Sequence, residues 1–307
     1  MLGLFQHRLH GCRCLGKVWN TFLPVKRCAT ESGPCIAGYW YSPVRRWIII
    51  SFIFIYPVSA VTPSQGDRPD LRGVWKTSYV SLDDPRWSIT DLACSGWCSL
   101  AASNYLEKLL SDPKNNARPV KVLLNEAQDY GKKQLDLLLT PLAKKKQAEY
   151  DPANDPAVDC DPDGDGLRHQ ITAPLPIRIN QFEEKILINY EYWKAVRTIY
   201  MDGRGHPEVE SPGRLGHSIG WYEGQTLVIE TKQILPALIS LPGGYIRHSS
   251  KAVLIERYAR SGNRLDLVWE IHDPIYFRQP YKGLKASLLA PNWELDEFVC
   301  EAITGEY

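Results

Sequence analysis

The sequence predicts a mainly β protein: an antiparallel β-barrel with a helical insertion after the first strand and a hydrophobic segment near the N-terminus. Short apolar runs with period-two alternation, separated by turn residues, fill the chain from residue 171 onward. Between about 88 and 149, leucines recur at helical spacing instead. The content of 10 Trp and 16 Tyr against 2 Met favours strands around a rigid aromatic interior.

The N-terminal region differs in character from the rest of the chain. A basic pair, Arg45-Arg46, precedes the apolar segment 47–61. Its core of about 14 apolar residues suits a signal peptide and is short for a bilayer span, and residues 58–60 are small enough for signal peptidase. Residues 1–46 then form an N-terminal extension, either the cytoplasmic tail of a signal anchor or sequence upstream of the true start. We expect a secretory-pathway protein, secreted or single-pass membrane-anchored (transmembrane), with its C-terminal domain non-cytoplasmic.

Four cysteines follow the apolar segment: Cys94, Cys98, Cys160 and Cys300. An oxidising compartment would pair an even set, and four cysteines allow three connectivities. We expect Cys94–Cys98, because their spacing is local, and Cys160–Cys300, which would tie the last strand to the start of the strand-rich half. A four-cysteine zinc site is the disfavoured alternative, since a second close pair is missing.

The barrel domain is predicted to span 71–307, after a polar linker at 62–70. Gly73-Val74-Trp75 opens the first strand, and a Gly-x-Trp at that place is typical of lipocalin-like barrels. The helical segment 88–149 is expected to pack on the barrel exterior or across one mouth, because its apolar stripes need a partner surface.

The stretch around His217 carries the highest density of ionisable groups, and His217 is predicted to lie on a strand next to the one bearing Glu230. A histidine held by a carboxylate could act as a general acid or base near neutral pH. The alternative is a histidine bonded to backbone at a strand end. Glu230 shares a strand face with Val228 and is predicted to point inward, where Arg257 or Arg197 would neutralise it. That Glu–Arg pair could also be purely structural.

Several classes of function find no support. The net charge of +1 argues against a nucleic-acid binder, which normally carries a basic face. The sequence contains no nucleophile elbow, P-loop, dinucleotide-binding glycine motif or HExxH, and so predicts no cofactor. A zinc site from His206, His217 and His248 is conceivable, but no short ligand spacing supports it.

A series of motifs resembles a large family of mostly uncharacterised secreted proteins. The motifs are YMDGRGHP at 200–207, GHSIGWYEG at 216–224, TLVIET at 226–231, VLIERY at 253–258, HDP at 272–274 and WEL at 293–295. The similarity covers about residues 67–301 and implies a signal-bearing, lipocalin-like (calycin-type) barrel without an established activity. The run ISLPGGYIRH at 239–248 departs from the family pattern and is expected to form a pocket-rim loop.

The expected function is a cofactor-independent cyclase, isomerase or dehydratase. Its substrate would be a hydrophobic small molecule, such as a natural-product intermediate of secondary metabolism, held in the barrel. The expected catalytic residues are His217, Glu230, Arg257 and Tyr258. The expected substrate-binding residues are Tyr190, Tyr192, Arg197, Trp221, Trp269 and His248. The alternatives are a lipocalin-like carrier of a lipophilic ligand, and a structural envelope protein with no cavity of roughly 300 Å³ or more.

Overall fold

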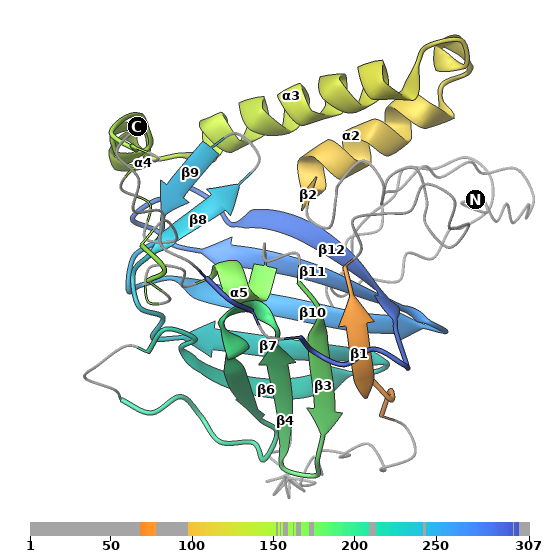
Figure 1. Ribbon diagram of the computed structural model, residues 1–307. Helices are drawn as coiled ribbons and strands as arrows, with labels where there is room; N and C mark the ends of the chain where they lie inside the picture. The colour runs from red at the N-terminus through yellow and green to blue at the C-terminus, as the bar shows by residue number, and fades with distance from the viewer. Residues whose placement is uncertain are drawn as a thin grey trace, which may run out of the picture. The chain divides into compact units, whose positions relative to one another are not determined.

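The computed structural model describes most of the chain from Arg68 onward (Figure 1). The described residues are 68–77, 98–151, 153, 155, 159–161, 163, 167–171, 175–208, 213–241, 244–296 and 298–300. They all belong to the compact unit Ala60–Tyr307. The predicted extension 1–46 and apolar segment 47–61 lie outside them. Among the described helices, none is long and apolar enough to cross a membrane.

Nine of the described strands close into a barrel, which confirms the predicted barrel. Their order around the ring is β1 (Gly73–Lys76), β3 (Ile177–Gln181), β4 (Lys185–Tyr190), β5 (Val196–Tyr200), β6 (His217–Glu223), β7 (Thr226–Lys232), β10 (Val253–Ser261), β11 (Arg264–His272) and β12 (Tyr281–Leu289). The ring closes where Trp75 of β1 pairs with Leu289 of β12. A short strand, β2 (Cys98–Ser99), adds to another part of β12.

One junction of the ring is parallel, although the sequence predicts an antiparallel barrel. Strands β5 and β6 run in the same direction, with Ile199 beside Ser218 and Tyr200 beside Ile219. Strand direction must return to itself around a closed ring, so the number of antiparallel junctions has to be even. With nine strands, at least one junction must therefore be parallel. The connection from β5 to β6 has to return to the starting end of the barrel, as a tight hairpin cannot.

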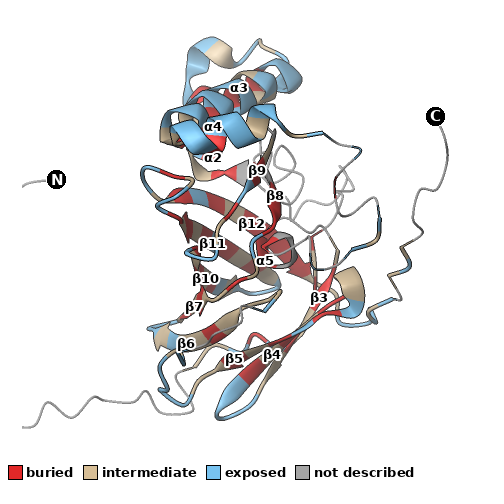
Figure 2. Cartoon of the chain, turned by 90° about the vertical axis from the view of Figure 1, so that its left-hand side faces the viewer, coloured by how far each residue is buried: buried red, intermediate tan, exposed pale blue. Residues whose placement is uncertain are grey.

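The barrel interior is packed around two tryptophans that are fully buried, Trp75 and Trp269. The Trp75 indole nitrogen donates to the Leu71 carbonyl at 2.8 Å. Trp269 lies over Gly283 of β12, where a Cβ atom would fall 1.9 Å from the Trp269 ring. A residue without a side chain is therefore required at that point. Figure 2 shows the buried residues concentrated on the strands of the barrel.

The helical insertion lies between β2 and β3 in the chain, as predicted. Its described elements are α2 (Leu100–Ser111), the 3-10 turn η1 (Pro113–Asn115), α3 (Val120–Leu138) and α4 (Pro141–Ala148). Ser99 caps α2 by accepting from the amide of Ala102 at 3.1 Å. Leu139, just after α3, forms a bridge with Phe277 and is buried with it in the main core. The insertion thus joins the core of the barrel, while the outer faces of α3 and α4 are exposed (Figure 2).

Two further segments cover the barrel. The helical turn α5 (Arg168–Ile171) follows Leu167, and both Leu167 and Ile171 are fully buried in the main core. The run at 239–248, expected to be a loop, instead contains a hairpin of β8 (Leu238–Leu241) and β9 (Gly244–Arg247). Ile239 and Ile246 of this hairpin are buried in the same core. The remaining 3-10 turn, η4 (Tyr192–Lys194), lies between β4 and β5.

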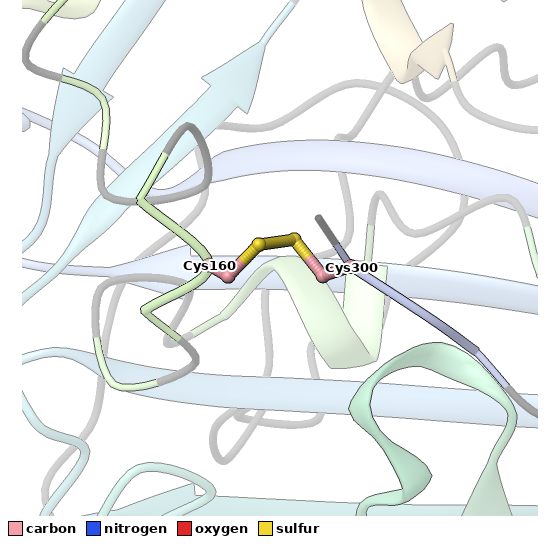
Figure 3. Close-up of a disulfide and its surroundings, with 2 residues drawn as sticks. All are labelled: Cys160 and Cys300. Atoms are coloured by element: carbon pink, nitrogen blue, oxygen red, sulfur yellow. A yellow bond between two sulfur atoms is a disulfide. The ribbon is translucent and has the colours of Figure 1, made fainter. Parts of the chain in front are cut away.

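The predicted disulfide Cys160–Cys300 is present (Figure 3). It joins the segment that precedes α5 to the C-terminal segment, across 140 residues of chain. The other predicted pairing, Cys94–Cys98, lies outside the described residues, because Cys94 and the side chain of Cys98 are not among them.

Loss of this disulfide should destabilise the fold. Cys160→Ser removes a cross-link that restricts the unfolded chain, so we expect the free energy of unfolding to fall by about 2–4 kcal/mol. Chemical denaturation under oxidising conditions measures it. Cys300→Ser and the double variant should fall by the same amount as Cys160→Ser. A larger loss in the double variant would show that each cysteine stabilises the fold independently of the bond.

Candidate functional site

A chain of hydrogen bonds links three ionisable side chains on the outer wall of the barrel. His217 of β6 contacts His206 through their two Nδ1 atoms, 2.9 Å apart. The Nε2 atom of His206 lies 3.1 Å from Oε1 of Glu230 on β7. We call Glu230, His206 and His217 the outer-wall relay. Lys232 also contacts Oε1 of Glu230, at 2.6 Å, and so anchors the carboxylate end.

Strand alternation fixes which wall the relay occupies. Ser218 and Thr231 are hydrogen-bonded to each other and to Arg197 in the barrel interior. Successive side chains of a strand point to opposite faces, so His217 and Glu230 point outward. The prediction that Glu230 points inward is therefore wrong, as is its predicted pairing with Arg257 or Arg197. Its partners are His206 and Lys232.

The donors and acceptors of the relay determine its tautomers. A carboxylate can only accept, so the His206 Nε2 atom carries the proton that Glu230 receives. The Nδ1 atom of a neutral His206 is then an acceptor, and His217 donates to it from its own Nδ1–H. This assignment leaves Nε2 of His217 as a basic lone pair, and no described residue hydrogen-bonds to that atom. The relay therefore has the form of a general base held and oriented by a second histidine and a carboxylate.

Aromatic and cationic groups surround the base. The Tyr200 ring stacks on the His217 ring with their centroids 5.1 Å apart. The guanidinium of Arg204 lies 4.0 Å from the Tyr200 centroid and is paired with Asp202, whose Oδ1 accepts from Arg204 Nε at 2.9 Å. A base beside a fixed cation is suited to reactions in which negative charge develops on the substrate.

Both histidines of the relay are kept neutral by their surroundings. Partial burial, then the charge of Lys232, lowers the pKa of His206, although Glu230 opposes this shift. Partial burial and the charge of Arg204 lower the pKa of His217. At neutral pH both rings are then uncharged, as an Nδ1-to-Nδ1 hydrogen bond requires.

A second group of ionisable side chains lies inside the barrel. Arg197 and Glu256 form a bidentate ion pair with both side chains at most 1% exposed. Arg197 also donates to Ser218 at 2.9 Å and to the Tyr190 hydroxyl at 3.3 Å. The Tyr258 hydroxyl donates to Glu256 at 3.0 Å. Burial raises the pKa of Tyr190 to about 12 and that of Tyr258 further, so both phenols stay protonated. This network satisfies the buried charges and holds four strands together.

The cavity beside this network is small. Its volume is about 10 Å³, which is room for one water molecule. Its lining consists of Gln170, Ile177, Tyr190, Tyr258, Leu265, Leu267, Lys285 and Ser287. The hydrophobic substrate expected in the barrel would need a far larger volume than these residues enclose.

The four predicted catalytic residues do not form one site. His217 and Glu230 belong to the outer-wall relay, whereas Tyr258 is buried in the interior network. Arg257 is on the outer wall, but it lies level with Val228 and Trp221, and its guanidinium is 3.9–4.0 Å from carboxylates of neighbouring strands.

The predicted substrate-binding residues are also scattered. Tyr190 and Arg197 belong to the interior network, and Trp269 packs over Gly283. Trp221 is 40% exposed on the outer wall. Tyr192 lies in η4, where its ring meets that of Phe298 at 5.0 Å.

His248 is separate from the other two histidines of the hypothetical zinc site. Its Nδ1 atom contacts the Ser249 carbonyl oxygen at 3.2 Å, and burial lowers its pKa to about 4. Across the part of the chain that the structure describes, no group of three or more His, Cys, Asp or Glu side chains could hold a metal ion.

Sequence reasoning missed three residues of these clusters. His206 was treated as a loop residue, because its contact with β6 depends on the path of the connection. Glu256 and Lys285 had a signal that could have been used. Each alternates with residues that face the interior, Glu256 between Leu254 and Tyr258, and Lys285 between Gly283 and Ser287.

The fold and these clusters define a closed, mainly antiparallel β-barrel with a two-histidine proton relay on its outer wall. Comparisons of the chain with protein-family models, with curated proteins and with solved structures find no match.

Proposed function

We propose that the chain is a cofactor-independent enzyme of the cyclase or isomerase type, which moves a proton on a hydrophobic small molecule at His217. The observation that supports this most is the hydrogen-bond chain from His217 through His206 to Glu230. We further propose that the barrel is lipocalin-like and that the chain enters the secretory pathway. The motifs at 200–231 and the apolar segment 47–61 support those two parts of the proposal.

In this mechanism, Nε2 of His217 accepts a proton from a carbon next to a carbonyl group of the substrate. Glu230, acting through His206, stabilises the positive charge that forms on the base, and the Nδ1 proton of His217 can shift toward His206. Arg204 stabilises the negative charge that develops on the substrate oxygen. Return of the proton to another atom completes an isomerisation, or follows a ring closure. Positioned general-base catalysis of this kind contributes about 10²–10⁴-fold in rate.

The placement of the substrate on the outer wall follows from the volumes available. The interior cavity admits a single water molecule, whereas His217 is partly exposed. The rings of Tyr200 and His217 offer an apolar surface for a hydrophobic molecule. In this proposal His217 is the catalytic residue, and His206 and Glu230 are positioning residues that act through it.

Hydrogen exchange with solvent tests the proposal without knowledge of the substrate. The protein is incubated in D₂O with a small-molecule extract of the cells that produce it, and mass spectrometry detects any compound that gains deuterium. We expect incorporation with the wild-type protein and a loss of about 10²–10⁴-fold with His217→Gln. His272→Gln is the matched control, because His272 is also on an outer strand and contacts Glu270 at 3.3 Å without a second histidine. It should leave the rate unchanged.

Other outcomes of this experiment have definite meanings. Equal incorporation by wild type and His217→Gln would contradict the proposal. A compound that binds the protein reproducibly without gaining deuterium, and whose affinity survives His217→Gln, would support the lipocalin-like carrier instead.

The rate of exchange should depend on pH in one direction. Only neutral His217 can accept a proton, and its pKa lies below the usual 6.5. We expect a constant rate near neutral pH, falling as the pH drops through a value below 6.5. Glu230→Gln should lower the rate and move this fall to lower pH, because the carboxylate raises the pKa of the relay. A pH profile of Glu230→Gln identical to that of the wild type would exclude Glu230 from the relay.

A further inference from the structure

The interior cavity brings a buried amine together with two phenols. Lys285 of β12 is 6% exposed and points into the barrel, like Gly283 and Ser287 on the same strand. It lines the cavity together with Tyr190 and Tyr258. The cavity holds about 10 Å³, so an atom group of the size of one water molecule can occupy it beside the amine.

The surrounding charges favour a neutral amine at this place. Arg197 and Glu256 already neutralise each other, so a charged Lys285 would be an additional buried cation. Burial lowers the pKa of Lys285 to about 8, although the charge of Glu256 opposes the shift. The phenols of Tyr190 and Tyr258, which also face the cavity, stay protonated. At pH 7 about one Lys285 amine in ten is then neutral, against roughly one in 2,500 for a lysine with the usual pKa of about 10.4.

We propose that Lys285 is a covalent binding site for small aldehydes, which condense with its amine to form an imine inside the barrel. The neutral Nζ adds to the aldehyde carbon and forms a carbinolamine. The two amine hydrogens then leave with the former carbonyl oxygen as one water molecule, and a carbon–nitrogen double bond remains. The step needs no oxidant or reductant, and the phenol hydroxyls beside the amine are suited to pass the protons. This site is independent of the outer-wall relay.

The segment that closes the barrel beside Lys285 gives the aldehyde a route of entry. Gln170 of α5 lines the same cavity, so displacement of α5 would open it. The disulfide Cys160–Cys300 ties the chain just before α5 to the C-terminal segment (Figure 3). Reduction of this bond should therefore make Lys285 more accessible, while exposed lysines on the same strand keep their accessibility.

Reductive methylation provides the test. The folded protein is treated at pH 7 with formaldehyde and sodium cyanoborohydride, which reduces the imine to a stable methylamine, and each lysine is followed by peptide mass spectrometry. Lys282 is the internal control, because it lies on the same strand with its side chain 45% exposed. We expect Lys285 to be methylated at least as fast as Lys282 despite its burial, and the rate at Lys285 to rise after reduction of the disulfide.

Two results would overturn the proposal. One is an unmodified Lys285, in both the oxidised and the reduced protein, after methylation of Lys282 is complete. The other is a rate at Lys285 that follows global unfolding, increasing across low urea concentrations in proportion to the unfolded fraction. Lys285→Met should abolish only the label at this site, and circular dichroism checks that the variant remains folded.

Discussion

Replacing Arg197 with Met should lower the free energy of unfolding by about 3–5 kcal/mol. The substitution leaves the carboxylate of Glu256 uncompensated in the barrel interior, where the side chains of both residues are at most 1% exposed. Ser218, Thr231 and Tyr190 lose a hydrogen-bond donor at the same time. Chemical denaturation followed by tryptophan fluorescence measures the loss.

Arg257→Met is the matched control for this substitution. Arg257 also lies near two carboxylates, but its side chain is 39% exposed and the closest contacts are 3.9–4.0 Å. An exposed ion pair of that kind contributes at most about 1 kcal/mol. Adding Glu256→Leu to Arg197→Met should recover part of the stability, because the unpaired charge is removed. A loss for Arg197→Met as small as that for Arg257→Met would mean that the interior ion pair does not hold the barrel together.

Gly283→Ala should destabilise the barrel by about 3 kcal/mol, at the upper end of the range for an overpacked core. The added Cβ atom would fall 1.9 Å from Cζ2 of Trp269, which is fully buried and cannot move without displacing its neighbours. The change should appear as a lower denaturation midpoint.

Gly205→Ala is the control for the glycine substitution. A Cβ atom at Gly205 meets nothing within 4 Å, so its effect should stay within about 0.5 kcal/mol. Trp269→Leu, combined with Gly283→Ala, should be less destabilising than the sum of the two single changes. Strict additivity would show that the two residues do not interact.

The sequence predicted most of the barrel because alternation is a local property of a strand. In β11, Leu265, Leu267, Trp269 and Ile271 alternate with polar residues, and the structure buries all four. The insertion was also predictable, since its leucines follow helical spacing and meet the core at Leu135 and Leu139. The Cys160–Cys300 pairing followed from the position of the two cysteines in the strand-rich half.

The candidate site was harder to predict because burial does not reveal which wall a residue faces. Val228 is fully buried, yet it lies on the outer face of β7 together with Glu230. The inference from an apolar neighbour to an inward carboxylate therefore failed. His206 could not be placed either, because its position depends on a connection between parallel strands, whose path is not determined by local sequence. His217 and Glu230 were correctly placed on neighbouring strands.

The parallel junction of the barrel has a consequence for how such a protein could change over evolutionary time. A tight hairpin has a fixed length, and an inserted residue there would shift the pairing of two strands. The connection between β5 and β6 is free of that restriction, and it supplies His206 to the relay. Insertions, deletions and substitutions in this one segment could therefore create or remove chemistry on the outer wall, while the pairing of every barrel strand stays as it is.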